Sequence, residues 1–116
     1  MKLYGIVNCS TVKKARSWLE QQGTAYQFHD FKKQGVPVEL AQAWLQQVGW
    51  EKLVNRNGQT WRALSPEQKL AIQNNDAALR LMLENPSVIK RPVLERNGTL
   101  LHTGFDEATY SQIINP

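Results

Sequence analysis

The chain has 116 residues, of which 41% are hydrophobic and 21% are charged, and this composition predicts one globular domain and excludes a disordered chain. No apolar run approaches the roughly 20 residues that span a bilayer, no signal peptide is visible, and the single cysteine fits a reducing compartment, so we expect a cytoplasmic protein that binds no membrane. The net charge of +4 comes from scattered basic residues, which favour solubility over a nucleic-acid-binding tail.

The N-terminal part of the chain predicts a βαβ unit. Residues 2–7 form an apolar run of strand length, and residues 11–22 place apolar side chains at helical spacing before a stop at Gly23. Residues 26–31 alternate apolar and polar side chains, as in a strand with one covered face. The two strands should be parallel, with a right-handed crossover between them.

The middle of the chain is predicted to be mainly helical. We expect a loop over residues 32–37 and then three helices, which begin at Pro37, Ser65 and Asp76 and end near Gly49, Asn74 and Asn85. Ser65 is followed by Pro66 and Gln68, the pattern of a capping box. Residues 50–64 contain a turn signal at 55–58 and are otherwise difficult to assign.

The C-terminal part predicts a β-hairpin and a last helix. Asn97-Gly98 between apolar runs indicates a hairpin with strands at 88–96 and 99–102. Pro92 falls inside the first of these strands, and a cis Arg91–Pro92 bond at the start of the strand would account for it. Asp106 is expected to cap the last helix. The whole chain is therefore predicted as a single domain, 1–116, with a helical insert at about 33–86.

Cys9 lies between the first predicted strand and the first predicted helix. The free N–H groups and the dipole of a helix N-terminus stabilise an anion, and they lower a thiol pKa from about 8.5 to about 3.5–7.5 in reactive cysteines. Asn8, Ser10 and Thr11 give this cysteine a polar, turn-forming setting. A small buried hydrophobe without chemistry is the alternative, and the local sequence leaves both interpretations open.

Five short motifs, spread along the chain, carry a family resemblance. They occupy residues 4–15, 53–56, 61–64, 89–94 and 103–105. In this order they resemble the arsenate-reductase-like branch of the thioredoxin fold, which includes glutaredoxin-linked arsenate reductases and the Spx and YffB proteins, and they are most similar to the YffB-like members. The resemblance implies an α/β fold with a thioredoxin-like mixed four-stranded sheet and a helical insert between the second and third strands.

The resemblance also implies roles for particular residues. Cys9 would be the attacking thiolate, and Arg91, before a cis Pro92, would bind an oxyanion or a substrate carboxylate beside the sulfur. Arg56 would reach the same site from the insert with Arg62 as a helper, although both are equally well interpreted as solvated loop arginines. The remaining substrate-binding candidates, which shape the loop or present N–H donors, are Asn8, Ser10, Thr11 and Pro92.

Three positions depart from the relatives. Arsenate reductases carry a third arginine after the hairpin, where this chain has His102-Thr103-Gly104, and this difference weakens an arsenate assignment. Val12 stands where Spx proteins have the second cysteine of their CxxC pair. Gly5 replaces a histidine of the arsenate reductases.

We expect a thiol-dependent reductase, with Cys9 forming an adduct with an arsenical, a disulfide or glutathione. Because the chain has no second cysteine, glutathione or glutaredoxin would resolve the adduct, and no bound cofactor is needed. The alternative is an Spx-type binding module that docks on RNA polymerase without catalysis. With either function we expect a monomer. A metal site is disfavoured, because Cys9, His29 and His102 lack ligand spacing.

Overall fold

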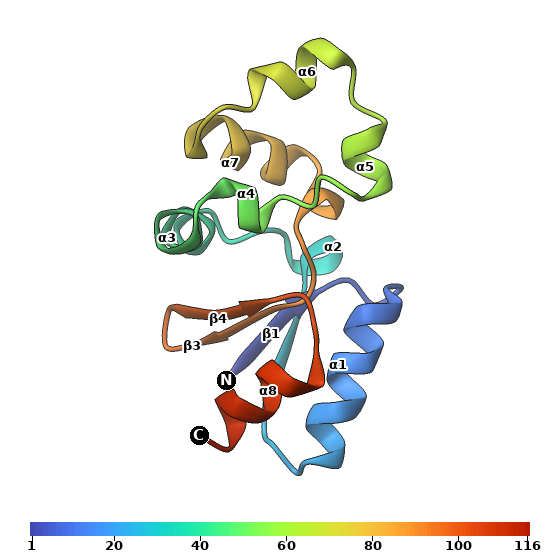
Figure 1. Ribbon diagram of the computed structural model, residues 1–116, viewed down its shortest axis with the longest axis vertical. Helices are drawn as coiled ribbons and strands as arrows, with labels where there is room; N and C mark the ends of the chain where they lie inside the picture. Colours follow the sequence, from blue (N-terminus) through green and yellow to red (C-terminus); the bar gives the residue numbers. More distant parts are fainter. The chain divides into compact units, whose positions relative to one another are not determined.

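The computed structural model describes all 116 residues and contains one four-stranded sheet (Figure 1). Its strands are β1 (Lys2–Gly5), β2 (Gln27–Asp30), β3 (Val93–Arg96) and β4 (Thr99–Thr103). The order across the sheet is β2-β1-β3-β4. Strand β1 is parallel to β2, whereas β3 is antiparallel to both β1 and β4. This arrangement confirms the predicted mixed sheet, with a parallel βαβ half joined to an antiparallel hairpin.

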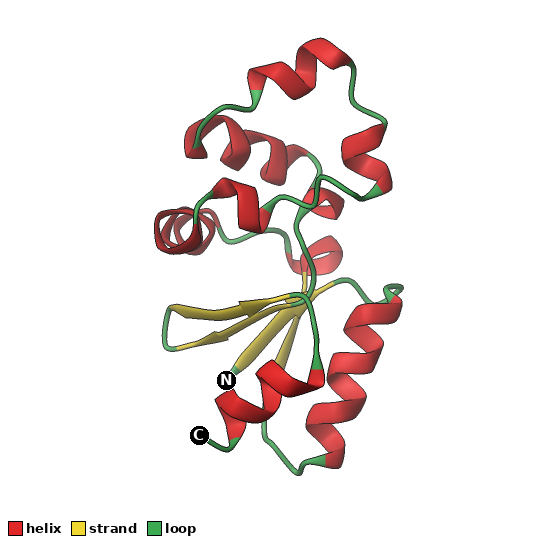
Figure 2. Cartoon of the chain, viewed as in Figure 1, coloured by secondary structure: helices red, strands yellow, loops and turns green.

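The chain divides into two compact units. The sheet unit comprises residues 1–34 and 91–116, and the helical unit comprises residues 35–90. All four strands belong to the sheet unit, while the helical unit consists of helices and loops (Figure 2) with one isolated β-bridge between Val54 and Ile89. None of the helices has the length and the apolar composition that crossing a membrane requires.

The core of the sheet unit lies between the sheet and two helices. Helices α1 (Ser10–Gln21) and α8 (Glu107–Ile114) cover the same face of the sheet (Figure 1). The fully buried side chains between these layers are Leu3, Ala15, Leu19, Leu94 and Tyr110. Removing this apolar surface from water stabilises the unit and holds the start of α1 at a defined place beside β1.

Local signals account for the ends of these elements. Gly23 follows α1 with φ of +68°, which is the left-handed conformation that glycine adopts readily. Asn97 and Gly98 both have positive φ, as the tight turn of a two-residue hairpin requires. Asp106 caps α8 as predicted, because its carboxylate accepts the N–H of Thr109 at 2.8 Å.

The helical unit is built around two helices that pack on each other, α3 (Val38–Val48) and α7 (Asn75–Glu84). Their buried side chains are Ala41, Trp44, Leu45, Ala78, Leu81 and Met82. The shorter helices are α4 (Trp50–Leu53), α5 (Gln59–Arg62), α6 (Pro66–Ala71) and the 3-10 turn η1 (Pro86–Val88). The predicted capping box is present, with Ser65 and Gln68 bonded reciprocally at the start of α6.

The structure corrects the predicted strand boundaries. Strand β1 ends at Gly5 instead of residue 7, and Val7 is 43% exposed. Strand β2 ends at Asp30, and the predicted loop begins with a short helix, α2 (Phe31–Gln34). Strand β3 begins at Val93 instead of residue 88, because the chain first forms η1. At the first and third strands an apolar run was interpreted as a longer strand, although burial does not require strand pairing.

Two helix boundaries were also wrong. Helix α6 ends at Ala71 instead of near residue 74. The cap of α7 is Asn74 instead of Asp76, since the Asn74 side chain accepts the N–H of Ala77 at 2.9 Å. Asp76 instead lies in the first turn of α7, where its negative charge interacts favourably with the helix dipole.

Candidate active site around Cys9

Cys9 is the N-cap residue of α1. Its backbone is extended, with φ of −129° and ψ of 122°, and its carbonyl accepts the N–H of Lys13 at 3.0 Å. An N-cap side chain lies beside the N–H groups of the first turn, which have no partner within the helix. The thiol is free and half-buried, so the sulfur is neither sealed in the core nor fully hydrated.

Gly5 allows the start of α1 to pack closely against the end of β1. A Cβ atom at Gly5 would lie 2.8 Å from Cγ2 of Val12, closer than side chains normally approach. Val12 is fully buried and stands three residues after Cys9, in the first turn of α1. The absence of a side chain at Gly5 therefore positions the turn whose N–H groups face the sulfur.

The surroundings of Cys9 favour the thiolate. Burial by itself raises the pKa of the thiol, but the backbone N–H of Val12, the guanidinium of Arg91 and the N–H of Thr11 act in the opposite direction. Their combined effect places the pKa of Cys9 below its ordinary value. Because the thiolate is the nucleophilic form, the site increases the reactivity of this sulfur at a given pH.

Arg91 reaches Cys9 from the segment that leads into β3. The Arg91–Pro92 bond is cis, as predicted. The Pro92 carbonyl accepts the N–H of Gly104 at 2.8 Å, which ties this segment to the end of the hairpin. The Arg91 side chain hydrogen-bonds to the sulfur of Cys9 and also acts on it through its charge. The structure thus brings together the two residues that the sequence singled out as catalytic.

The other predicted residues of the Cys9 loop differ in what they contribute. Thr11 supplies one of the N–H groups that favour the thiolate. Asn8 and Ser10 flank the cysteine and are exposed, and their role with a substrate stays a prediction. Val12 was not predicted as a residue of the site, yet of the groups that favour the thiolate its N–H has the largest effect. Its position three residues after a capping residue is the signal that would have found it.

Arg56 and Arg62 belong to the helical unit, and their predicted role at Cys9 stays a prediction. Within that unit the Arg56 guanidinium lies over the ring of Trp50, 5.3 Å from its centroid, and 3.8 Å from the Glu51 carboxylate. Arg62 is exposed at the end of α5. Arg56 is therefore more constrained by its neighbours than a freely solvated arginine.

His102 does not stand in for an arginine at the site. Its Nε2 atom lies 3.0 Å from Oδ2 of Asp106, the residue that caps α8, and its ring packs edge-on against Tyr110. As expected, this histidine satisfies a local polar contact. No three His, Cys, Asp or Glu side chains are grouped so that they would hold a metal ion.

Comparison with known proteins gives consistent matches along the whole chain. The model of the ArsC family matches residues 4–113. A protein of unknown function from Haemophilus influenzae is 38% identical over 108 residues, which cover 93% of each chain. The solved structure of a protein named YffB is 44% identical, has a TM-score of 0.88 and covers 96% of both chains.

Two further relatives have names that point to function. The solved structure of an arsenate reductase related protein from Brucella melitensis is 45% identical, with a TM-score of 0.78, and covers 99% of this chain and 94% of that one. The global transcriptional regulator Spx of Enterococcus faecalis is 24% identical over 110 residues, which cover 92% of this chain and 80% of the regulator. The matches thus include both an enzyme-related protein and a regulator.

Proposed function

The chain belongs to the ArsC family, and from this premise we propose that it is a thiol-dependent reductase with Cys9 as its nucleophile. The observation that carries the proposal is the lowered pKa of a half-buried thiol at a helix N-terminus, beside the Arg91 guanidinium. A structural cysteine has no need of such surroundings, because burial alone raises the pKa of a thiol.

The proposed reaction is exchange with a mixed disulfide of glutathione. The Cys9 thiolate attacks the glutathione sulfur, a new bond forms between these two sulfurs, and the remainder of the substrate leaves as a thiolate. Cys9 is the only cysteine of the chain, so a second thiol from outside must attack the glutathione sulfur of this adduct. Glutathione or glutaredoxin would supply that thiol, and Cys9 would then leave as the thiolate. The net result is one reduced substrate thiol and one oxidised partner.

The residues around the sulfur would act in both steps. The N–H groups of Val12 and Thr11 and the charge of Arg91 favour the thiolate, which is the attacking form in the first step and the leaving group in the second. The Arg91 guanidinium offers several donors in one plane, so it would also bind a carboxylate of the substrate next to the reacting sulfur. Arsenate is a less suitable substrate for this chain, because no arginine follows the hairpin.

Mass spectrometry of the protein incubated with oxidised glutathione tests the proposal. We expect one glutathionyl group on Cys9, removed by reduced glutathione with glutaredoxin, and no adduct on Cys9→Ser. The rate of Cys9 alkylation, followed against pH, should have its midpoint below that of a free cysteine. A midpoint at the free-cysteine value, together with no adduct, would contradict the proposal.

Docking without catalysis is the second candidate, and the relationship to the Spx regulators favours it. In this alternative the surface of the chain would bind RNA polymerase, and the chemistry of Cys9 would be irrelevant. Binding of purified wild-type protein and Cys9→Ser to RNA polymerase discriminates between the two functions. Equal binding by both proteins, with no glutathionyl adduct on the wild type, would favour docking, and no binding by either would exclude it.

A further inference from the structure

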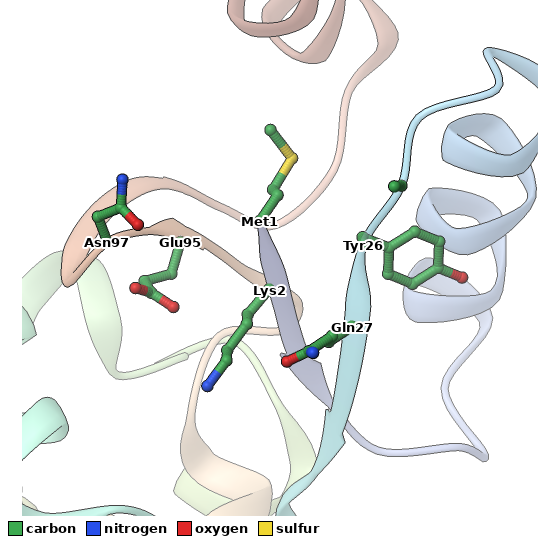
Figure 3. A pocket seen from close by; sticks show the side chains of 7 residues that line it. Met1, Lys2, Tyr26, Gln27, Glu95 and Asn97 are labelled. Atoms are coloured by element: carbon green, nitrogen blue, oxygen red, sulfur yellow. The ribbon is translucent and has the colours of Figure 1, made fainter.

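A cavity of about 460 Å³ lies on the sheet unit where β1 begins (Figure 3). Its volume falls in the range of small-molecule sites, roughly 300–1,000 Å³. The charged and amide side chains that line it come from three neighbouring strands and the hairpin turn, and they are Lys2, Gln27, Glu95 and Asn97. The site around Cys9 uses none of them.

The register of the sheet places three of these side chains in a row. Lys2 of β1 pairs with Gln27 of β2 on one side and with Glu95 of β3 on the other. Directly paired residues of adjacent strands project from the same face of a sheet. An amide, an ammonium group and a carboxylate therefore stand side by side, as the three side chains do in Figure 3.

Neutral donors hold the Glu95 carboxylate in place. Glu95 is 5% exposed, and the hydroxyl of Tyr4 donates to its Oε2 at 3.2 Å while the N–H of Gly98 donates to its Oε1. Burial, and then the charge of Glu95, raise the pKa of Tyr4, so its hydroxyl stays protonated and continues to donate. A carboxylate oxygen has two acceptor positions, so both oxygens keep capacity for a further donor.

Lys2 and Glu95 face each other across the sheet without forming an ion pair. A buried carboxylate is normally paired with a cation, because an unpaired buried charge is costly. The wall of the cavity therefore offers a negative group and a positive group that are not paired with each other. A ligand with one ammonium group and one carboxylate complements both.

We propose that this cavity binds a small zwitterion, an amino acid or a dipeptide. The ammonium group of the ligand contacts the Glu95 carboxylate, and its carboxylate contacts the Lys2 ammonium group. The Gln27 amide has both donors and an acceptor, so it bonds to either end of the ligand. The cavity is thus a second ligand site on the sheet unit, and it does not depend on the thiol chemistry of Cys9.

Titration of the full chain with glycine and with glycylglycine, followed by amide NMR shifts, tests the proposal. We expect millimolar binding of at least one of them, with shifts at Lys2, Gln27, Glu95 and Asn97 and none at residues 8–11. The blocked probes N-acetylglycylglycine and glycylglycine amide lack the ammonium group and the carboxylate, respectively. Each should bind roughly tenfold more weakly than glycylglycine.

Two variants assign the charged contacts. Lys2→Met should weaken binding of glycylglycine and abolish the difference in affinity between glycylglycine and its amide. Glu95→Gln should also weaken binding of glycylglycine, and it should abolish the difference in affinity between glycylglycine and N-acetylglycylglycine. Lys33→Met removes an exposed charge elsewhere and serves as the control. If Glu95→Gln fails to fold, Lys2→Met and the two blocked probes still decide the question. No shifts at millimolar probe, or equal binding of charged and blocked probes, would overturn the proposal.

Discussion

Two acidic side chains lie near opposite ends of strand β1, and their surroundings differ: Cys9 caps the helix that follows the strand, and Glu95 of β3 pairs with Lys2, the first residue of β1. Past the last residue of the strand, the pKa of Cys9 is lowered by two backbone N–H groups and by the full positive charge of Arg91. At the first residue, Glu95 is more deeply buried, and it accepts hydrogen bonds only from the neutral Tyr4 hydroxyl and the Gly98 N–H.

This difference separates a reactive acidic group from a binding group. At Cys9 the cation and the sulfur are already in contact, so the cation acts on the protonation of the nucleophile itself. At Glu95 the available cation, Lys2, is not paired with the carboxylate, so both charges stay available to a ligand. We therefore expect changes near Cys9 to alter the reactivity of its thiol, and changes near Glu95 to alter stability and ligand binding without altering that reactivity.

Gly5→Ala should have the largest effect, because it acts on folding and on Cys9 together. The new Cβ would lie 2.8 Å from Cγ2 of fully buried Val12, and overpacking of this kind costs about 1–3 kcal/mol. Moving the first turn of α1 also moves the N–H groups that favour the thiolate, so the pKa of Cys9 should rise. Urea unfolding and the pH dependence of Cys9 alkylation measure the two effects.

The double variant Gly5→Ala with Val12→Ala provides the control. Removing two methyl groups from Val12 makes room for the new Cβ, so the double variant should be more stable than the sum of the single effects implies. Strict additivity of the two changes would show that the contact between residues 5 and 12 does not position α1.

Tyr4→Phe should destabilise the chain by about 1–3 kcal/mol without changing Cys9 alkylation, because it removes one donor from a buried carboxylate. Burial, then the charge of Glu95, raise the pKa of Tyr4 above its ordinary value of 10.0. Above this value unfolding releases the Tyr4 proton, so the wild type loses the part of its stability that comes from protonated Tyr4, a contribution that the variant lacks at every pH. The difference in the free energy of unfolding between the wild type and Tyr4→Phe should therefore narrow above about pH 10, which urea unfolding at several pH values measures.

Tyr26→Phe is the matched control for this change. The Tyr26 hydroxyl bonds to Arg16 and Glu20 at the surface, so its loss should change stability by no more than about 0.5 kcal/mol. An equal loss of unfolding free energy in Tyr4→Phe and Tyr26→Phe would mean that the buried hydrogen bond to Glu95 stabilises the chain no more than a surface hydrogen bond does.

Features with a short sequence signal were predictable. The capping box at Ser65, the cap at Asp106 and the Asn97-Gly98 turn each depend on a few adjacent residues, and the structure has all three. Apolar runs were less informative, because burial is compatible with several backbone conformations. Val88 and Ile89 are each 1% exposed, yet the chain there forms a 3-10 turn and an isolated bridge instead of a strand.

The two sites differ in the same way. Cys9 at a helix start was foreseeable from adjacent residues, and the resemblance to a known family pointed to Arg91. The cavity at Glu95 was not foreseeable, because it depends on which residues of three strands stand side by side. The register of the β3–β4 pairing also shifts between Leu94 and Glu95, and no local sequence pattern predicts this irregularity.

Arg91→Met should have the smallest effect on the free energy of unfolding. It tests most directly whether a cation, and not only neutral hydrogen-bond donors, lowers the pKa of Cys9. Without the guanidinium, the pKa of Cys9 should rise, so alkylation near neutral pH should slow several-fold and then converge with the wild type at alkaline pH. The N–H groups of Val12 and Thr11 remain, so they should still oppose the effect of burial and limit the rise of the midpoint. Arg96→Met, an equal loss of charge at an exposed position of β3, should leave the midpoint unchanged. If both variants have the alkylation midpoint of the wild type, the N–H groups of the helix N-terminus alone lower the pKa of Cys9. Cys9 and Glu95 would then be alike, because neutral donors would stabilise both.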